Sequence, residues 1–263
     1  MEEKKFDPLQ FIGFILIALI LTWMLYRNGP VEEQKSESNT TTEQGVTPPS
    51  SSEESKNSAA FIQQQKVESF GNLGTLFKPN SVENISISTE NISYEVQSKG
   101  AQIVVLQLDK FENFADNPLR LISESNSDFN VKLSTLDGRV LNTRDIFFTP
   151  TLTDQADSFK LLMTASISTR QSIVFEYVFP KQGYLYTVNL ITEGMQTLLN
   201  SNTPPNFTWK TDAFRNSRSI DYENRYTEFT FGYEEDRVDY LSLNGEDKES
   251  RDGIRWISYR QHF

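Results

Sequence analysis

Hydrophobic and polar residues alternate along most of the chain from residue 82 onward. Ile85 and Ile87 alternate with serine and asparagine, and Ile92, Tyr94 and Val96 repeat this pattern shortly afterwards. The alternation returns at residues 129–133, 159–165, 207–209, 229–233 and 240–243, with a more continuous apolar run at residues 103–108. A period of two is typical of strands with one buried face. Many short strands without a long helical period predict an antiparallel β-sandwich or barrel over residues 81–263.

The clearest hairpin signal lies at residues 173–190. Alternating apolar residues at 173–179 and 184–190 flank residues 180–183, which include Pro180 and Gly183. Proline fixes φ and glycine accepts a positive φ, so both favour a turn. The pattern therefore predicts two paired strands joined by a four-residue connection at 180–183. Residues 98–100 and 136–138 carry similar glycine turn signals.

The N-terminal region follows a different pattern. Residues 9–26 contain no charged side chain, and Trp23 and Tyr26 lie near one end of this run. As a helix the run is about 27 Å long, close to the ~30 Å hydrocarbon core of a bilayer. A cleaved signal peptide would end in small residues, whereas this run ends in Met-Leu-Tyr-Arg. Residues 1–27 therefore predict a cytoplasmic N-terminus and an uncleaved membrane anchor. Lys4 and Lys5 favour that orientation, with the rest of the chain outside the cytoplasm.

The segment between the anchor and the alternating region is polar and acidic. Residues 29–58 consist almost entirely of Glu, Ser, Thr, Asn, Gln, Lys, Gly and Pro, with Val31 and Val46 as the apolar exceptions. Such a segment cannot bury a core, so residues 28–80 are predicted to form a disordered tether. Residues 59–77 contain scattered apolar side chains, and the pattern leaves open a short helix or a collar at the domain edge.

Composition narrows the functional classes. The 263 residues include 25 Lys and Arg against 36 Asp and Glu, giving a net charge of −11. An acidic chain repels phosphate backbones, so nucleic acid is not an expected partner. The absence of cysteine excludes disulfides, thiolate metal sites and cysteine nucleophiles.

Four carboxylates form the most concentrated group of candidate site residues: Glu234, Glu235, Asp236 and Asp239. Such a cluster could hold a cation or supply a glycosidase pair. A metal loop would need regularly spaced oxygen ligands and a glycine, which this segment lacks. The interpretation as an exposed turn between two strands is therefore favoured.

Basic and aromatic residues offer no clearer site. The single histidine, His262, has no visible nucleophile or carboxylate partner in the sequence. Arg215, Arg218 and Arg225 form a loose basic run that is interpreted as a solvated loop. The aromatic residues lie mainly at positions expected to face inward, so core packing is their predicted role. We accordingly predict no enzymatic activity, cofactor or metal, and assign no catalytic, cofactor-binding or metal-binding residue.

Several segments, in this order, resemble the YidC membrane protein insertase family of diderm bacteria. Residues 4–8, leading into the apolar run at 12–26, are similar to the start of the family's first helix, and an acidic Ser/Thr-rich tether follows. Residues 83–111 resemble its opening strands. Residues 253–263, with Trp256, Gln261 and Phe263 in that order, resemble the segment that closes its large periplasmic domain. The match covers nearly the whole chain.

The resemblance implies a β-supersandwich like that of galactose mutarotases, located in the periplasm and anchored in the inner membrane. It implies a chaperone-like role in inserting and folding nascent inner-membrane proteins, alone or with the Sec translocon, including contact with SecDF. The family's working part is a later five-helix bundle with a hydrophilic groove, so this sequence is expected to be an N-terminal fragment. Two other classes stay open: an anchored carbohydrate-binding or mutarotase-like module, and an envelope scaffold.

Overall fold

A computed structural model of the chain describes residues 51–123, 126–234, 236–242 and 248–261, with side chains from residue 60 onward. These residues belong to one compact unit, Ser50–Phe263. The predicted membrane helix at residues 9–26, the first part of the predicted tether and His262 lie outside the described residues. Among the helices that the structure does describe, none has the length and hydropathy needed to cross a bilayer.

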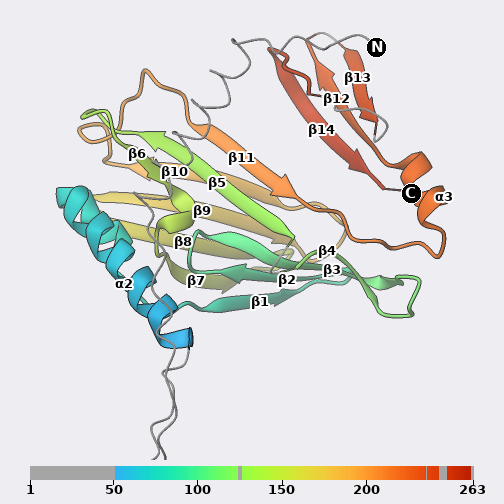
Figure 1. Cartoon of the computed structure of the whole chain (residues 1–263), viewed down its shortest axis with the longest axis horizontal. Helices are drawn as coiled ribbons and strands as arrows, with labels where there is room; N and C mark the ends of the chain where they lie inside the picture. Colours follow the sequence, from blue (N-terminus) through green and yellow to red (C-terminus); the bar gives the residue numbers. More distant parts are fainter. Residues whose placement is uncertain (1–50, 124–125, 235, 243–247, 262–263) are drawn as a thin grey trace, which may run out of the picture. The chain divides into compact units, whose positions relative to one another are not determined.

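All strand pairs in the described region are antiparallel, as the alternating pattern predicts. They form four sheets (Figure 1). One sheet contains β1 (Asn84–Ser88), β2 (Ile92–Gln97), β3 (Gln102–Glu112) and β4 (Pro118–Ile122). A second contains β7 (Thr149–Asp154), β8 (Ser158–Ser168), β9 (Gln171–Pro180) and β10 (Thr187–Glu193). The third contains β5 (Ser127–Ser134), β6 (Val140–Asn142) and β11 (Asn206–Thr211), and the fourth β12 (Glu228–Tyr233), β13 (Arg237–Ser242) and β14 (Ile254–Arg260).

The first three sheets share one hydrophobic core. Tyr94 of β2 packs its ring 4.6 Å from that of Phe179 on β9, and Phe129 of β5 lies 5.9 Å from Phe175 on β9. Both β9 rings are almost completely buried. Packing between faces of different sheets is what defines a β-sandwich. The predicted all-β antiparallel sandwich is therefore confirmed.

The packed region begins earlier than the boundary expected at residue 81. Helix α2 (Ser51–Ser69) leads into the 3₁₀ helix η1 (Gly71–Phe77), so the open choice for residues 59–77 is resolved as helix. Three η1 side chains are buried in the sandwich core: Leu73, Leu76 and Phe77. Burying such side chains stabilises by about 1.5–3 kcal/mol each, which explains how so few apolar residues order this segment.

The predicted β9–β10 hairpin is confirmed, but its connection is longer than four residues. Val178 pairs with Thr187, which leaves Tyr184 and Tyr186 outside β10. The Tyr186 ring lies 5.7 Å from those of Tyr94 and Phe179. Aromatic packing of this kind adds about 0.5–1.5 kcal/mol beyond burial, so it favours the longer loop over a tight turn.

Candidate functional site

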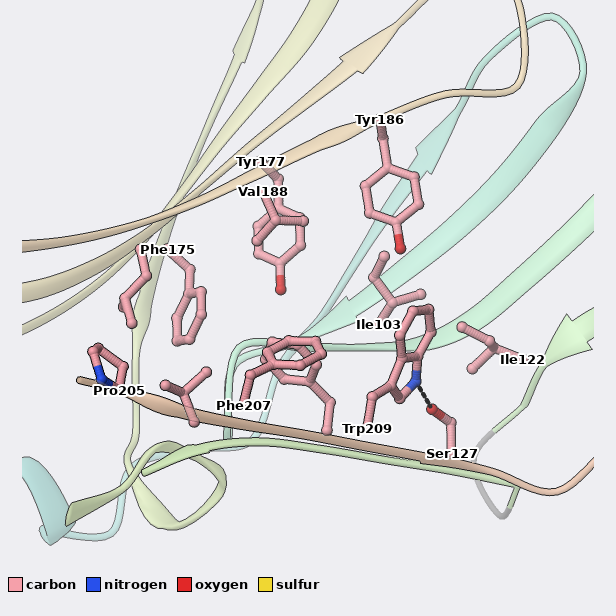
Figure 2. A pocket seen from close by; sticks show the side chains of 13 residues that line it. Ile103, Ile122, Ser127, Phe175, Tyr177, Tyr186, Val188, Pro205, Phe207 and Trp209 are labelled. Carbon is pink, nitrogen blue, oxygen red and sulfur yellow. Dashed lines mark hydrogen bonds between the residues drawn. The ribbon is translucent and has the colours of Figure 1, made fainter. Parts of the chain in front are cut away.

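An apolar cleft lies between the sheets that carry β10 and β11 (Figure 2). Its volume is about 500 Å³, within the range of small-molecule sites. The cleft is lined by Ile103, Ile122, Ser127, Phe129, Val131, Phe175, Tyr177, Tyr186, Val188, Leu190, Pro205, Phe207 and Trp209. Strands β3, β4, β5, β9, β10 and β11 therefore all contribute to its walls.

The period of two explains how β11 and β5 form one wall. Phe207 pairs with Val131 and Trp209 pairs with Phe129, so the two strands present the same face to the cleft. The rings of Phe129 and Phe207 meet edge to face at 5.2 Å. On the opposite wall, Val188 and Leu190 are two residues apart on β10 and share a face in the same way.

Two of the polar side chains at the cleft, Tyr177 and Trp209, have hydrogen-bond partners inside the domain. The Tyr177 hydroxyl donates to the Ala101 carbonyl, and the Trp209 indole N–H donates to Ser127 Oγ over 3.0 Å. Burial raises the pKa of Tyr177 and of Tyr186 above the usual tyrosine range. Neutral phenols in an apolar surround suit the binding of apolar groups and do not favour acid–base chemistry at neutral pH. The hydroxyl groups of a sugar would find few partners here.

Of the candidate carboxylates, Glu234 and Asp236 lie in the turn between β12 and β13, and Asp239 lies on β13. Glu234 and Asp236 have positive φ values of 49° and 62°, and both are exposed. Glu234 pairs with Arg237 at 3.4 Å, and Asp239 pairs with Arg251 at 3.5 Å. Within the described residues, no group of His, Cys, Asp or Glu side chains is arranged to hold a metal ion. Glu235 lies outside these residues.

The three arginines do not converge on one site. Arg215 lies 4.5 Å above the Phe114 ring and donates to the Ser217 carbonyl over 3.0 Å, and it also donates to the Arg218 carbonyl. Arg225 is in the last turn of α3 (Ile220–Tyr226). Arg215 is exposed, in keeping with its interpretation as part of a solvated loop, and its guanidinium group also packs on an aromatic ring.

The expectation that aromatic residues serve mainly in the core needs correction at the C-terminal strands. Exposed fractions reach 59% for Phe207, 50% for Trp209, 47% for Trp256 and 63% for Tyr240. These side chains belong to β11 and to the β12–β14 sheet. No described residues cover these apolar side chains completely. Period-two alternation predicted β11, β12 and part of β13, but it predicted neither β14 nor the exposure of these side chains.

Sequence reasoning missed a buried acidic residue that fixes the loop before α3. Glu223 of α3 is only 2% exposed, and its carboxylate accepts from the backbone N–H of Asn216 at 2.9 Å and of Ser217 at 3.0 Å. The Gln261 side chain donates to the same carboxylate. These contacts tie three separate segments together. A lone glutamate in a polar stretch gives no signal of this role.

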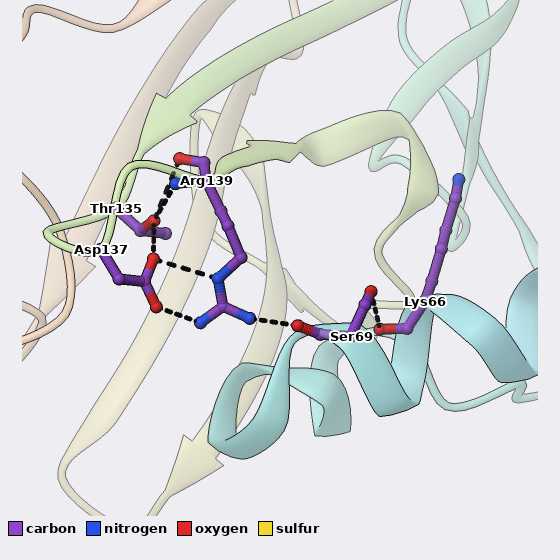
Figure 3. A network of polar contacts seen from close by, with 5 residues as sticks. All are labelled: Lys66, Ser69, Thr135, Asp137 and Arg139. Carbon is purple, nitrogen blue, oxygen red and sulfur yellow. Dashed lines mark hydrogen bonds and ion pairs between the residues drawn. The ribbon is translucent and has the colours of Figure 1, made fainter.

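A second polar network fixes the end of α2 to the sandwich (Figure 3). The Arg139 guanidinium donates to the Ser69 carbonyl, pairs with Asp137 through Nε at 3.0 Å, and lies 4.9 Å from the Phe70 ring. The Lys66 ammonium pairs with Asp145 at 2.8 Å. A cation at a helix C-terminus also complements the helix dipole. Hydrogen bonds from Arg139 and then from Thr135 hold the pKa of Asp137 well below its usual range.

Comparison with known proteins identifies the family of the domain that contains the cleft. Residues 84–263 match the family model described as the YidC periplasmic domain. The chain belongs to this family. The matched range begins at the first residue of β1 and includes every residue that lines the cleft, whereas α2 and η1 precede it.

Curated relatives carry the name membrane protein insertase YidC. The protein from Porphyromonas gingivalis is 28% identical over 184 residues, covering 69% of this chain and 29% of the relative. The protein from Chloroherpeton thalassium is 25% identical over 270 residues, covering 98% of this chain and 45% of the relative. This chain thus spans less than half the length of the YidC relatives described. No solved structure gives a significant match.

Proposed function

We propose that this chain is the membrane anchor and periplasmic domain of a membrane protein insertase. In this proposal the protein acts as a chaperone that helps nascent inner-membrane proteins insert and fold, alone or with the Sec translocon. The observation that carries the proposal is the YidC periplasmic domain match over residues 84–263, together with relatives named as insertases. Such a function involves no catalytic residue in this chain.

The sequence and the fold both support the proposed layout. Residues 1–27 supply a cytoplasmic N-terminus and a helix in the inner membrane, and a polar tether leads to α2. The sandwich then lies in the periplasm, where its partners are nascent inner-membrane proteins and the Sec translocon, including SecDF. The network around Arg139 holds the end of α2 against the sandwich. It therefore supports a fixed position for the point where the tether joins the sandwich.

Within this proposal the sandwich contacts partner proteins and sets their distance from the membrane. The insertion step belongs to other parts of the protein. A charge at the bilayer centre costs about 2.5–3.5 kcal/mol even on lenient insertion scales, so an insertase needs a polar surface inside the membrane. The apolar run at residues 9–26 offers no charged side chain for this purpose. The cleft lining is apolar and belongs to the sandwich.

Complementation in cells depleted of their own insertase tests the proposal. We would express three versions: the whole gene, residues 1–263 alone, and the whole gene without residues 84–263. The whole gene should restore growth and client insertion, and residues 1–263 alone should not. Failure of the whole gene would overturn the insertase function. Rescue by residues 1–263 alone would overturn the division of roles. Crosslinking from exposed sandwich positions to SecDF would test the partner separately.

A further inference from the structure

The sheet formed by β12, β13 and β14 has two faces of different chemistry (Figure 1). Successive residues of a strand point to opposite faces, and paired residues share a face. The registers place four large apolar residues on one face: Phe229, Phe231, Ile257 and Tyr259. The other face holds five hydrophilic residues, which are Glu228, Thr230, Ser242, Ser258 and Arg260. This second composition is typical of the solvated face of an antiparallel sheet.

A tryptophan lies across a glycine on this solvated face. Trp256 of β14 pairs with Gly232 of the central strand β12, and a Cβ added to Gly232 would collide with the indole atoms Nε1, Cε2 and Cδ1. The ring therefore occupies the space that a side chain of β12 would fill. Glycine weakens a strand interior and often marks a close approach of another group. The arrangement holds the indole against the sheet while Trp256 remains 47% exposed.

Two further apolar side chains lie on the same face. Val238 of β13 pairs with Gly232 from the other side, and Tyr240 lies two residues further along β13. Their exposed fractions are 59% and 63%. An aromatic ring over a strand glycine stabilises a sheet, which by itself would explain Trp256. It does not explain a second exposed ring beside it. We call Trp256, Val238 and Tyr240 the aromatic platform.

The neighbouring rows of this face provide hydrogen-bonding groups. Thr230 lies between Tyr240 and Ser258, and the next row contains the ion pair of Glu228 with Arg260 at 2.9 Å. Rows on one face are about 7 Å apart, so the platform and the ion pair lie within about 14 Å of each other. A carboxylate accepts, a guanidinium group donates, and hydroxyl groups do both. The ion pair is neutral overall, so this face offers adjacent donors and acceptors without net charge.

We propose that this face binds a neutral β-linked oligosaccharide. The C–H groups of a pyranose ring suit the negative face of an aromatic ring, so the sugar stacks on Trp256 and Tyr240. Its hydroxyl groups donate to Glu228 and accept from Arg260. β-Linked chains are flat and extended, which fits a sheet surface of this length. A proline-rich peptide also stacks on aromatic rings, but its carbonyl acceptors leave Glu228 without a partner. This inference goes beyond the proposed insertase function and does not depend on it.

Titration with short sugars tests the proposal. The probes are cellotriose and chitotriose, with a proline hexapeptide for comparison, and calorimetry on the whole chain in detergent measures Kd. At least one sugar should bind saturably and more tightly than the peptide. Trp256→Ala and Tyr240→Ala should each raise its Kd at least about tenfold. Trp209→Ala is the matched control, because Trp209 is a 50% exposed tryptophan of the cleft, and it should leave Kd unchanged.

The tyrosine variant keeps the test decisive if loss of the indole unfolds the sheet. Tyr240 is 63% exposed, so Tyr240→Ala should leave the midpoint of urea unfolding unchanged while it weakens sugar binding. Failure of the unmodified chain to bind either sugar would overturn the proposal, as would an unchanged Kd in Tyr240→Ala. Loss of binding in Trp209→Ala alone would place the sugar in the cleft, and tighter binding of the peptide would make this face a peptide surface. Either result contradicts the proposal, whether or not the protein inserts clients.

Discussion

Strands β9 and β10 are hydrogen-bonded neighbours with similar alternating sequences, yet their side chains have different environments. On β9, Phe175 and Tyr177 are 1% and 2% exposed. On β10, Val188 pairs with Tyr177 but is 38% exposed, and Leu190 pairs with Phe175 but is only half-buried. Strand β9 has neighbours on both sides and faces the core, whereas β10 has one neighbour and borders the cleft. Alternation specifies a strand, but its burial depends on what packs against it.

The largest effect should come from truncating a core ring on β9. Phe175→Ala removes a ring that lies within 5.6–6.4 Å of those of Phe148, Phe129 and Tyr177, and should lower the free energy of unfolding by about 3–5 kcal/mol. Val188→Ala on β10 should cost less than about 1 kcal/mol in residues 1–263. Urea unfolding followed by circular dichroism measures both. Equal losses would show that the cleft wall already belongs to a closed core.

The next effect concerns the core at high pH. Burial, followed by repulsion from Tyr186, raises the pKa of Tyr94 to about 12. The neutral phenol is favoured in the folded state, so its stabilising contribution is complete below pH ~10 and is lost as pH rises toward 12. The wild-type domain should lose up to about 2–3 kcal/mol of unfolding free energy over this pH range because of Tyr94, and Tyr94→Phe should remove that part of the loss.

Urea unfolding between pH 9 and 12 measures this difference. Tyr240→Phe is the matched control, because Tyr240 is 63% exposed and should leave the pH profile unchanged. If both variants changed the profile equally, or neither did, the burial of Tyr94 would not determine the pH response. The result would sharpen the contrast between the core and the exposed C-terminal sheet.

A smaller, local effect is expected where α2 meets the sandwich. Arg139→Ala removes the donor to the Ser69 carbonyl and the partner of Asp137, so amides at residues 63–69 should exchange faster while the sheets keep their protection. Arg139→Lys should rescue this only in part, because an ammonium group cannot reproduce the forked geometry. Arg120→Ala, which loses a surface bond to Gln107, is the control. Unchanged exchange at α2 would contradict the role of this network.

Acid should leave the Arg139–Asp137 pair intact across the ordinary carboxylate range. The pKa of Asp137 is lowered in the folded state, so its contribution is present above the usual aspartate pKa and is lost only as pH falls through the lowered value. Exchange at α2 should therefore stay slow to a pH below about 4. Release of α2 near that value would indicate an ordinary aspartate.

The sequence predicted the strands with clean alternation and missed elements with weak local signals. Strands β2, β8 and β9 place bulky side chains at every second position, and this periodicity predicts a strand without tertiary information. Strand β7, TPTLTD, has one large apolar residue, and its pairing with β8 fixes it. Helix α3 spans only seven residues, too few to establish a period, although Ser219 caps it by accepting from the Tyr222 N–H.

The cleft could not have been predicted in the same way. Its walls come from six strands, and its shape depends on how three sheets pack around shared rings. Alternation on β11 marked Phe207 and Trp209 as facing one side, which the structure confirms. The pattern carries no information about whether that side is covered, because a missing neighbour leaves no trace in the strand itself.

The smallest effect is expected at the carboxylates of the β12–β13 turn, where exposure is greatest and packing least. Glu234 and Asp236 have φ values of 49° and 62°, a region that glycine adopts without strain. The ion pair of Glu234 with Arg237 is exposed, and such pairs contribute little. Glu234→Gly and Asp236→Gly should each change the free energy of unfolding by no more than about 0.5 kcal/mol. Alanine at the same positions keeps the charge change but adds backbone strain, so Asp236→Ala should be the more destabilising of the two Asp236 variants. Urea unfolding compares them directly. A loss of several kcal/mol in both variants would mean that the carboxylates, and not the turn backbone, stabilise this part of the domain.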